Sequence, residues 1–188
     1  MENLTERLAE LFLKFPGIGR RQARRFVQHA MTMDEADARA LLESIAGLRK
    51  KMRPCARCLR YSTTSICTTC ADTNRAHGIL MLVRHDVDIE NIERANVYHG
   101  KYFVIGNLEK PPLDHLLRIV HSQKPIEIVL ALPANPEGDY TSQILRDALA
   151  ETKIPISTLG RGLSTGTELE YADGETLRAA LTNRRSVP

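Results

Sequence analysis

Apolar residues recur at helical spacing through residues 1–50. The first apolar face comprises Leu4, Leu8, Leu11, Phe12 and Phe15. The second comprises Ala23, Phe26, Val27 and Ala30. The third, after an expected capping box of Thr32 and Glu35, comprises Leu41, Ile45 and Leu48. Because residues three and four positions apart share one side of a helix, the pattern predicts three amphipathic helices whose apolar faces form a core.

Beyond residue 78 the pattern changes to short apolar runs that alternate with helical spacing. It predicts strands at 79–83, 102–105, 126–132 and 156–159, and helices at 86–95, 113–120 and 144–149. Strands alternating with helices predict a parallel sheet covered on both faces, so the fold class is α/β. Ligands of such sheets bind beyond the carboxyl ends of the strands. Those ends carry Arg84-His85-Asp86 and the segment 135–139.

The four cysteines of the chain form two CxxC pairs separated by eight residues: Cys55, Cys58, Cys67 and Cys70. Each pair can present both thiolates to one ion, and nearby arginines at positions 53, 57 and 60 favour thiolate over thiol. The spacing predicts one structural zinc ion per chain, with no open coordination position for catalysis. The alternatives are structural disulfides or a redox CxxC. Disulfides would require export, and a redox motif would not need duplication.

Composition and charge set the cellular context. Hydrophobic residues make up 43% of the chain, as in ordinary globular proteins. Met1 leads directly into a charged helical pattern, and the longest apolar run, 78–83, is far too short to cross a bilayer. We therefore expect a cytoplasmic protein without membrane contact.

Charge is distributed unevenly along the chain. Through residue 60 there are 13 Lys/Arg against 7 Asp/Glu, and beyond it there are 13 Lys/Arg against 16 Asp/Glu. This asymmetry indicates a polyanion-binding N-terminal part, or alternatively an uneven solvated surface.

The turn between the first two predicted helices reads Pro16-Gly17-Ile18-Gly19. Gly17 and Gly19 allow a tight turn with positive φ, and backbone N–H groups at the following helix start can hold a phosphate oxygen. This is the helix–hairpin–helix pattern of a sequence-independent DNA backbone reader. The next helix then presents paired guanidinium groups on successive turns, from Arg20, Arg21, Arg24 and Arg25. We therefore expect nucleic acid here rather than an ordinary helix–helix turn.

Several motifs occur together in one order along the chain. The hairpin and the cysteine pairs precede a Glu-Gly-x-x-Thr turn at Glu137, Gly138 and Thr141, the stretch 160–163 (GRGL) and a tail reading LEYAD at 169–173. This ordered set resembles the RecR family of bacterial recombination mediators, over nearly the whole chain. The resemblance implies a helix–hairpin–helix region at 1–53, a four-cysteine zinc finger at 54–76, a Toprim-type α/β domain at 77–163 and a short C-terminal Walker-B-like tail at 164–188.

The resemblance also implies function. Members of the family are non-enzymatic DNA-repair proteins that form ring-shaped oligomers, dimers or tetramers. They act with RecO and RecF to load RecA onto single strands, and they bind duplex DNA and single/double-strand junctions. By position, the hairpin arginines would face DNA and the cysteines would hold zinc. Partner binding would fall on Glu137, Asp139, Glu170 and Asp173. The last two would mark a strand end, although no GxxxxGK[ST] motif for nucleotide binding is present.

One departure from the family pattern bears on catalysis. The Toprim fold usually places a glutamate after its first strand, where this chain has Arg84. Because hard cations need oxygen ligands, a guanidinium there argues against Mg²⁺ chemistry. The competing hypotheses are a small zinc-containing Toprim nuclease or topoisomerase-like enzyme, which would need that acid, and a zinc-stabilised RNA-binding protein. No small-molecule substrate is expected.

Overall fold

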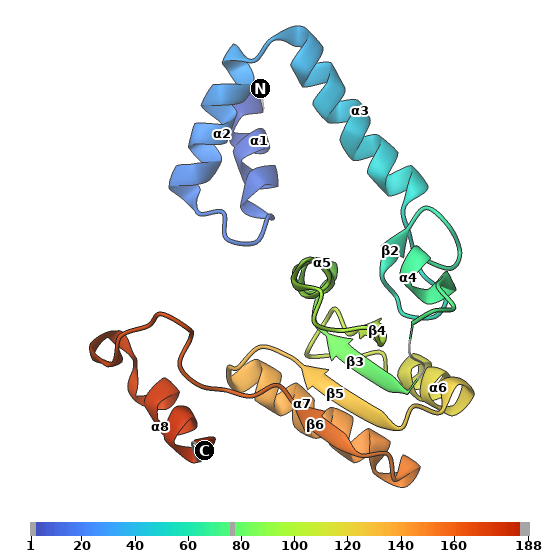
Figure 1. Cartoon of the computed structure of the whole chain (residues 1–188). Helices are drawn as coiled ribbons and strands as arrows, with labels where there is room; N and C mark the ends of the chain where they lie inside the picture. Colours follow the sequence, from blue (N-terminus) through green and yellow to red (C-terminus); the bar gives the residue numbers. More distant parts are fainter. Residues whose placement is uncertain (1–2, 76–77, 185–188) are drawn as a thin grey trace. The chain divides into compact units, whose positions relative to one another are not determined.

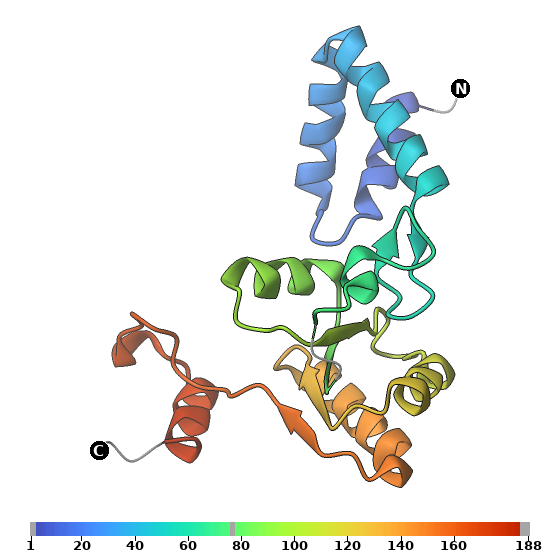
Figure 2. The ribbon, with the colours of Figure 1, turned by 45° about the vertical axis from the view of Figure 1, so that its right-hand side comes forward.

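The computed structural model describes residues 3–75 and 78–184, and the chain divides into two compact units, residues 1–52 and 53–188 (Figure 1). The first unit is helical: α1 (Leu4–Leu13), α2 (Arg20–Thr32) and α3 (Glu35–Lys51). Helices α1 and α2 lie side by side as a hairpin (Figures 1 and 2). The Phe12 and Phe26 rings pack with centroids 5.3 Å apart, and Ala23 and Val27 are buried. The expected helical pair is therefore present, but three residues of the first apolar face, Leu4, Leu11 and Phe15, are exposed and do not join the expected core.

Two expectations for the third helix are wrong. Thr32 ends α2, and its hydroxyl donates to the carbonyl of His29. The N-cap of α3 is instead Asp34, whose carboxylate accepts from the backbone N–H of Ala36 at 2.8 Å. The apolar stripe on α3 was expected to be core, yet its side chains are exposed: Leu41, Ile45 and Leu48. The periodicity identified an amphipathic helix but not what covers it.

The second unit begins with the cysteine-containing knuckle. Strands β1 (Arg53–Pro54) and β2 (Tyr61–Ser62) pair antiparallel, and a single turn of helix, α4 (Thr68–Ala71), follows. The first CxxC pair lies between the two strands, and the second includes the start of α4. The four cysteines form their own buried cluster, against which only Ile66 packs among the described residues. A knuckle with so little apolar core depends on other contacts for its order.

The rest of the unit is the expected α/β layer. Its strands are β3 (Ile79–Val83), β4 (Lys101–Val104), β5 (Glu127–Ala131) and β6 (Ile156–Thr158). They pair in parallel in the order β4-β3-β5-β6. The flanking helices are α5 (Asp86–Ala95), α6 (Leu113–Gln123) and α7 (Pro136–Leu149). Figure 1 shows α5 on one face of the sheet and α6 with α7 on the other.

Alternating strand residues build the two cores. Leu80 and Leu82 of β3 join a cluster with Leu116 of α6 and Leu145 of α7, whereas Met81 and Val83 pack with Ile89 of α5. Because successive side chains of a strand point to opposite faces, a continuous apolar run serves both cores. This arrangement confirms the α/β prediction. Helix α7 is longer than expected, since Pro136 occupies its first turn and Asn135 caps it by accepting from the N–H of Gly138.

The C-terminal segment contains no strand within residues 159–184. It has the short 3-10 turn η2 (Leu169–Tyr171) and the helix α8 (Gly174–Thr182), whereas another 3-10 turn, η1 (Ala150–Thr152), directly follows α7. The strand end expected around Glu170 and Asp173 is therefore wrong, because Asp173 is the N-cap of α8. None of the helices in the described ranges is long and apolar enough to cross a membrane.

Candidate functional sites: a metal centre, a basic hairpin and the strand ends

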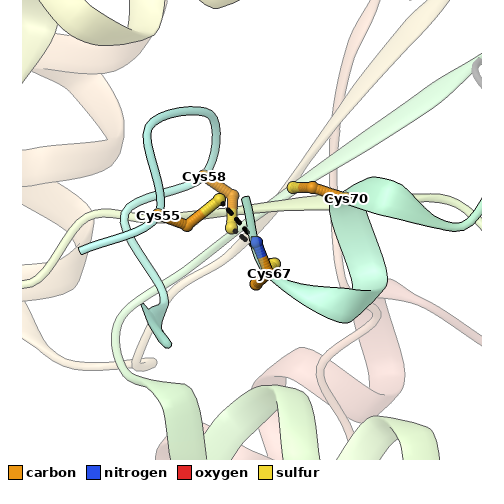
Figure 3. A group of neighbouring side chains, drawn as sticks. All are labelled: Cys55, Cys58, Cys67 and Cys70. Atoms are coloured by element: carbon orange, nitrogen blue, oxygen red, sulfur yellow. Dashed lines mark hydrogen bonds between the residues drawn. The ribbon is translucent and has the colours of Figure 1, made fainter. Parts of the chain in front are cut away.

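The four cysteine side chains converge on one point. Their Sγ atoms all lie within 4.8 Å of one another and all four residues are buried (Figure 3). The Sγ atoms of Cys58 and Cys67 are 3.6 Å apart. Zn–S bonds of about 2.3 Å in a tetrahedron place sulfurs roughly 3.8 Å apart. The residues therefore fit a single tetrathiolate zinc ion, which would hold the two loops of the knuckle together.

The backbone around the sulfurs is arranged to support negative charge. The N–H groups of Arg57 and Cys67 both donate to Sγ of Cys55, at 3.5 and 3.3 Å. Without a metal, the contact between Cys58 and Cys67 lowers the pKa of the Cys67 thiol and raises the pKa of the Cys58 thiol. The fold thus already favours one thiolate in the cluster. Metal binding would deprotonate the others.

The arginines near the cysteines do not act as direct thiolate partners. Arg57 donates through Nη1 to the carbonyl of Cys70 at 3.2 Å, and Arg60 donates to the hydroxyl of Thr69. Arg60 also lies 3.9 Å from Asp86, a carboxylate that accepts from the N–H of Tyr61. These arginines therefore link the first CxxC loop of the knuckle to the second, and the knuckle to the start of α5.

The turn between α1 and α2 has the geometry that its glycines allow. Gly17 has φ of 76°, in the left-handed region that favours glycine. Gly19 differs from the expectation, with φ of −89° and ψ of 170°, and it is the N-cap of α2. A glycine cap supplies no side-chain acceptor, so the first N–H groups of α2 have no capping bond. Within residues 3–75 and 78–184, no side chain caps the start of α2, so its first N–H groups can donate to a ligand.

The four arginines that follow are all exposed: Arg20, Arg21, Arg24 and Arg25. None of them forms an ion pair with a carboxylate within residues 3–75 and 78–184, in contrast to Arg39 on α3, which pairs with Glu35 at 2.8 Å. Positions four apart share one side of a helix, so Arg21 lies beside Arg25 and Arg20 beside Arg24. Uncompensated guanidinium groups at a helix start form a site for polyanions.

The strand ends bring together residues that lie far apart in sequence. Nη1 of Arg84, after β3, lies 3.3 Å from Oε2 of Glu137 in the first turn of α7. Asp139, in the same turn, pairs with Arg161 from the segment after β6, and this guanidinium holds the pKa of the carboxyl below its usual range. Both expected partner-binding carboxylates of α7 are therefore neutralised by arginines of the same chain.

The four residues expected to bind partners do not form one cluster. Asp139 and Asp173 line a common groove of about 710 Å³ between the start of α7 and α8, with Arg161 and Arg178 among its other walls. Glu137 is not among the residues that line this groove and forms its ion pair with Arg84. Glu170 is exposed in η2. Asp173 accepts from the N–H groups of Glu175 and Thr176, both at 2.9 Å. Its carboxylate therefore already has a structural role.

Two residues of these sites were not anticipated. Arg161 lies in the glycine-containing stretch 160–163, but its pairing with Asp139 depends on the return of the chain past α7. Lys101, the first residue of β4, is only 4% exposed although it is a lysine. Its environment in the sequence, between Gly100 and Tyr102, carries no signal of that burial. Only the sheet order places it against the knuckle.

Together these features define a class: a Toprim-type α/β protein with a four-cysteine knuckle before its sheet and a basic helical hairpin in a separate unit. The family model described as "RecR, C-terminal" matches residues 162–185. Full-length similarity is found to the recombination protein RecR of Bifidobacterium adolescentis, 35% identical over 97% of this chain and 96% of that protein. The RecR proteins of Rhodospirillum rubrum (35%; 97% and 97%) and Porphyromonas gingivalis (32%; 96% and 92%) are similar throughout. The chain belongs to the RecR family.

Proposed function

We propose that this protein is a non-enzymatic, DNA-binding mediator of recombinational repair, which acts with RecO and RecF to load RecA onto single-stranded DNA. The names of its relatives, recombination proteins, support the pathway. The observation that carries DNA binding is the set of four exposed arginines after the glycine-capped turn, which have no carboxylate partners within residues 3–75 and 78–184. Contacts of this kind read phosphates and not bases, so binding would be independent of sequence.

The proposal includes one structural zinc ion per chain, bound by the four convergent cysteines. It also keeps the expected division of the chain into residues 1–53, 54–76, 77–163 and 164–188. A tetrathiolate site has no free coordination position, so this zinc would stabilise the fold and would not take part in chemistry. The convergence of four buried thiols supports this role.

The strand ends support a non-enzymatic role. A Toprim enzyme would use clustered carboxylates to hold divalent cations on phosphate oxygens. Here Arg84 pairs with Glu137, and Arg161 pairs with Asp139. We propose that this surface, with Glu170 and Asp173, contacts protein partners instead. A partner would then meet two ion pairs and the groove beside α8.

The DNA proposal is tested with the double variant Arg21→Ala, Arg25→Ala. Both side chains lie on one exposed face of α2, so the fold should be unaffected while two phosphate contacts are lost. Each contact contributes about 0.7 to 0.9 to the slope of log K against log salt, so the slope should fall by about 1.4 to 1.8. Binding to unrelated duplexes should weaken equally. Fluorescence anisotropy across a salt series measures both quantities.

The matched control removes the same charge elsewhere, with Arg39→Ala and Arg94→Ala. Arg39 lies on α3, where it pairs with Glu35, and the exposed Arg94 lies on α5. Neither residue therefore belongs to the hairpin of α1 and α2. This control should retain the slope of the unmodified protein. An unchanged slope and affinity in the hairpin variant would contradict the proposed DNA site. Equal losses in both variants would show that only total charge matters.

A further inference from the structure

We propose that Lys101 is a second-sphere residue of the zinc centre, whose buried ammonium holds the second CxxC pair in place and slows zinc release. The inference rests on the zinc occupancy proposed above. Nζ of Lys101 donates to three backbone carbonyls of the segment that carries Cys70: Thr69 at 3.1 Å, Cys70 at 3.5 Å and Asp72 at 2.6 Å. An ammonium has three protons, so these carbonyls use its full donor capacity.

Lys101 has an unusual electrostatic environment for a buried cation. Lys101 is 4% exposed, and its ammonium forms no ion pair with a carboxylate within the described ranges. Buried charges in proteins are normally paired. Four thiolates around Zn²⁺ leave a net charge of about −2, and Cys70 belongs both to that set and to the carbonyls bound by Lys101. A bound zinc ion with its four thiolates would therefore supply the negative charge that the environment of Lys101 otherwise lacks.

The same strand also holds the first CxxC pair. The N–H of Val104, at the far end of β4, donates to the carbonyl of Cys58 at 2.8 Å. Strand β4 is at the edge of the sheet, so the N–H of Val104 has no partner strand among the described residues and donates to the knuckle instead. Leu59 of the knuckle packs against the main core, whereas a cavity of about 380 Å³, lined by Arg57, Cys70 and Lys101 among others, lies between the knuckle and α6. Polar bonds from β4 therefore act together with this apolar contact to link the knuckle to the sheet.

A site whose ligands are held rigidly releases its metal more slowly. Loss of a second-sphere partner typically lowers metal affinity about 10- to 100-fold. Lys101→Met removes the ammonium but keeps an unbranched side chain of similar length. Zinc transfer from the loaded protein to an excess of the chelating dye 4-(2-pyridylazo)resorcinol should be about tenfold faster or more in this variant. Lys101→Arg, which retains the charge and donors, should restore slow release.

Lys110→Met is the matched control, because Lys110 is exposed in the loop after β4. It should release zinc at the rate of the unmodified protein. Replacement of zinc by Co²⁺ gives a second readout, because a changed charge beside the thiolates should shift the thiolate-to-cobalt absorption in Lys101→Met only. Circular dichroism of each loaded variant checks that release is compared between folded proteins.

Equal release rates in folded Lys101→Met and unmodified protein would overturn the inference. If Lys101→Met does not fold, Lys101→Gln replaces it, because the amide keeps N–H donors but removes the charge. Release from this folded variant should be faster by about threefold or more, and an unchanged rate would overturn the inference. Metal analysis of the unmodified protein separates the two proposals. Absence of zinc would overturn the metal site itself, whereas zinc with unchanged release would overturn only the role of Lys101.

Discussion

At the scale of single residues, the position after β3 decides what the strand ends can do. A carboxylate there would lie beside Glu137 and near Asp139, and oxygen ligands in that arrangement attract divalent cations. Arg84 instead donates to Glu137 at 3.3 Å. Its Nε is buried without a hydrogen-bond partner within the described residues, which shows that the guanidinium is not ideally solvated. Arg84 therefore forms an internal ion pair at a position where a carboxylate would favour a cation site.

We predict that Arg84→Glu creates a cation site. The introduced carboxylate would face Glu137, and the repulsion between them is relieved when a divalent cation binds. Thermal unfolding should show that Mn²⁺ raises the Tm of this variant but not that of the unmodified protein. Arg94→Glu, on the exposed surface of α5, makes the same charge change away from the strand ends. An identical Mn²⁺ response in Arg84→Glu and the control would contradict the prediction.

At the scale of elements, helix starts in this chain differ in how they are capped. Helix α2 begins at Gly19 with no side-chain cap and is followed by arginines, whereas α8 begins at Asp173, whose carboxylate accepts two backbone N–H groups. At a capped helix start, a side chain of the same chain accepts from the first backbone N–H groups, whereas at an uncapped start these donors are available to a ligand. This difference distinguishes α2, the proposed DNA site, from α8, whose N-terminal N–H groups already bind Asp173.

We predict that Asp173 acts on α8 as a cap and not as a free charge. The N–H and hydroxyl of Thr176 hold its pKa below the usual range. A carboxyl of this kind adds stability above its unfolded pKa of about 3.9, and the contribution is lost as pH falls through the lower folded value. Asp173→Ala should therefore reduce hydrogen-exchange protection at the start of α8 at neutral pH, and acidification should do the same in the unmodified protein.

Asp173→Asn provides the control for that prediction. Asparagine caps helices about as well as aspartate but carries no charge. It should retain protection at neutral pH and remove the acid dependence, as measured by exchange with mass spectrometry. Loss of protection equal to that of Asp173→Ala would contradict the prediction, because it would show that the charge of Asp173, and not its capping oxygen, stabilises the start of α8.

At the scale of the whole molecule, the exposed stripe on α3 remains to be explained. Leu41 is 49% exposed, Ile45 48% and Leu48 60%, on a helix that has no buried residue. Apolar stripes of this kind are normally covered by another surface. The homo-oligomer that the family resemblance implies would offer one, and a ring would present several basic hairpins to one DNA molecule, which would raise avidity without new contacts.

We predict that Ile45→Glu lowers the oligomeric state. A carboxylate in the middle of an apolar contact would be desolvated without a partner, which opposes association. Light scattering after size-exclusion chromatography should give a smaller molar mass. Ala36→Glu adds the same charge on the opposite side of α3, where it is exposed, and should leave the mass unchanged. An unchanged mass in Ile45→Glu would place the contact elsewhere.

The sequence by itself determined features encoded in short windows. The apolar run at 79–83 is strand β3 and the segment 86–95 is α5, as expected, because period and side-chain branching act over a few residues. The cysteine spacing predicted a cluster that the fold assembles, and the glycines marked the turn before α2. Local chemistry sufficed in each case.

Tertiary structure alone decided which of these elements meet. Arg84 reaches Glu137, 53 positions away, because β3 and β5 are neighbours in a sheet whose spatial order differs from the chain order. Lys101 is buried because β4 is the edge strand on which the knuckle docks. The apolar stripe of α3 was visible in sequence, but its exposure was not. Pairing between distant segments depends on strand order and helix placement, which no local window of the chain contains.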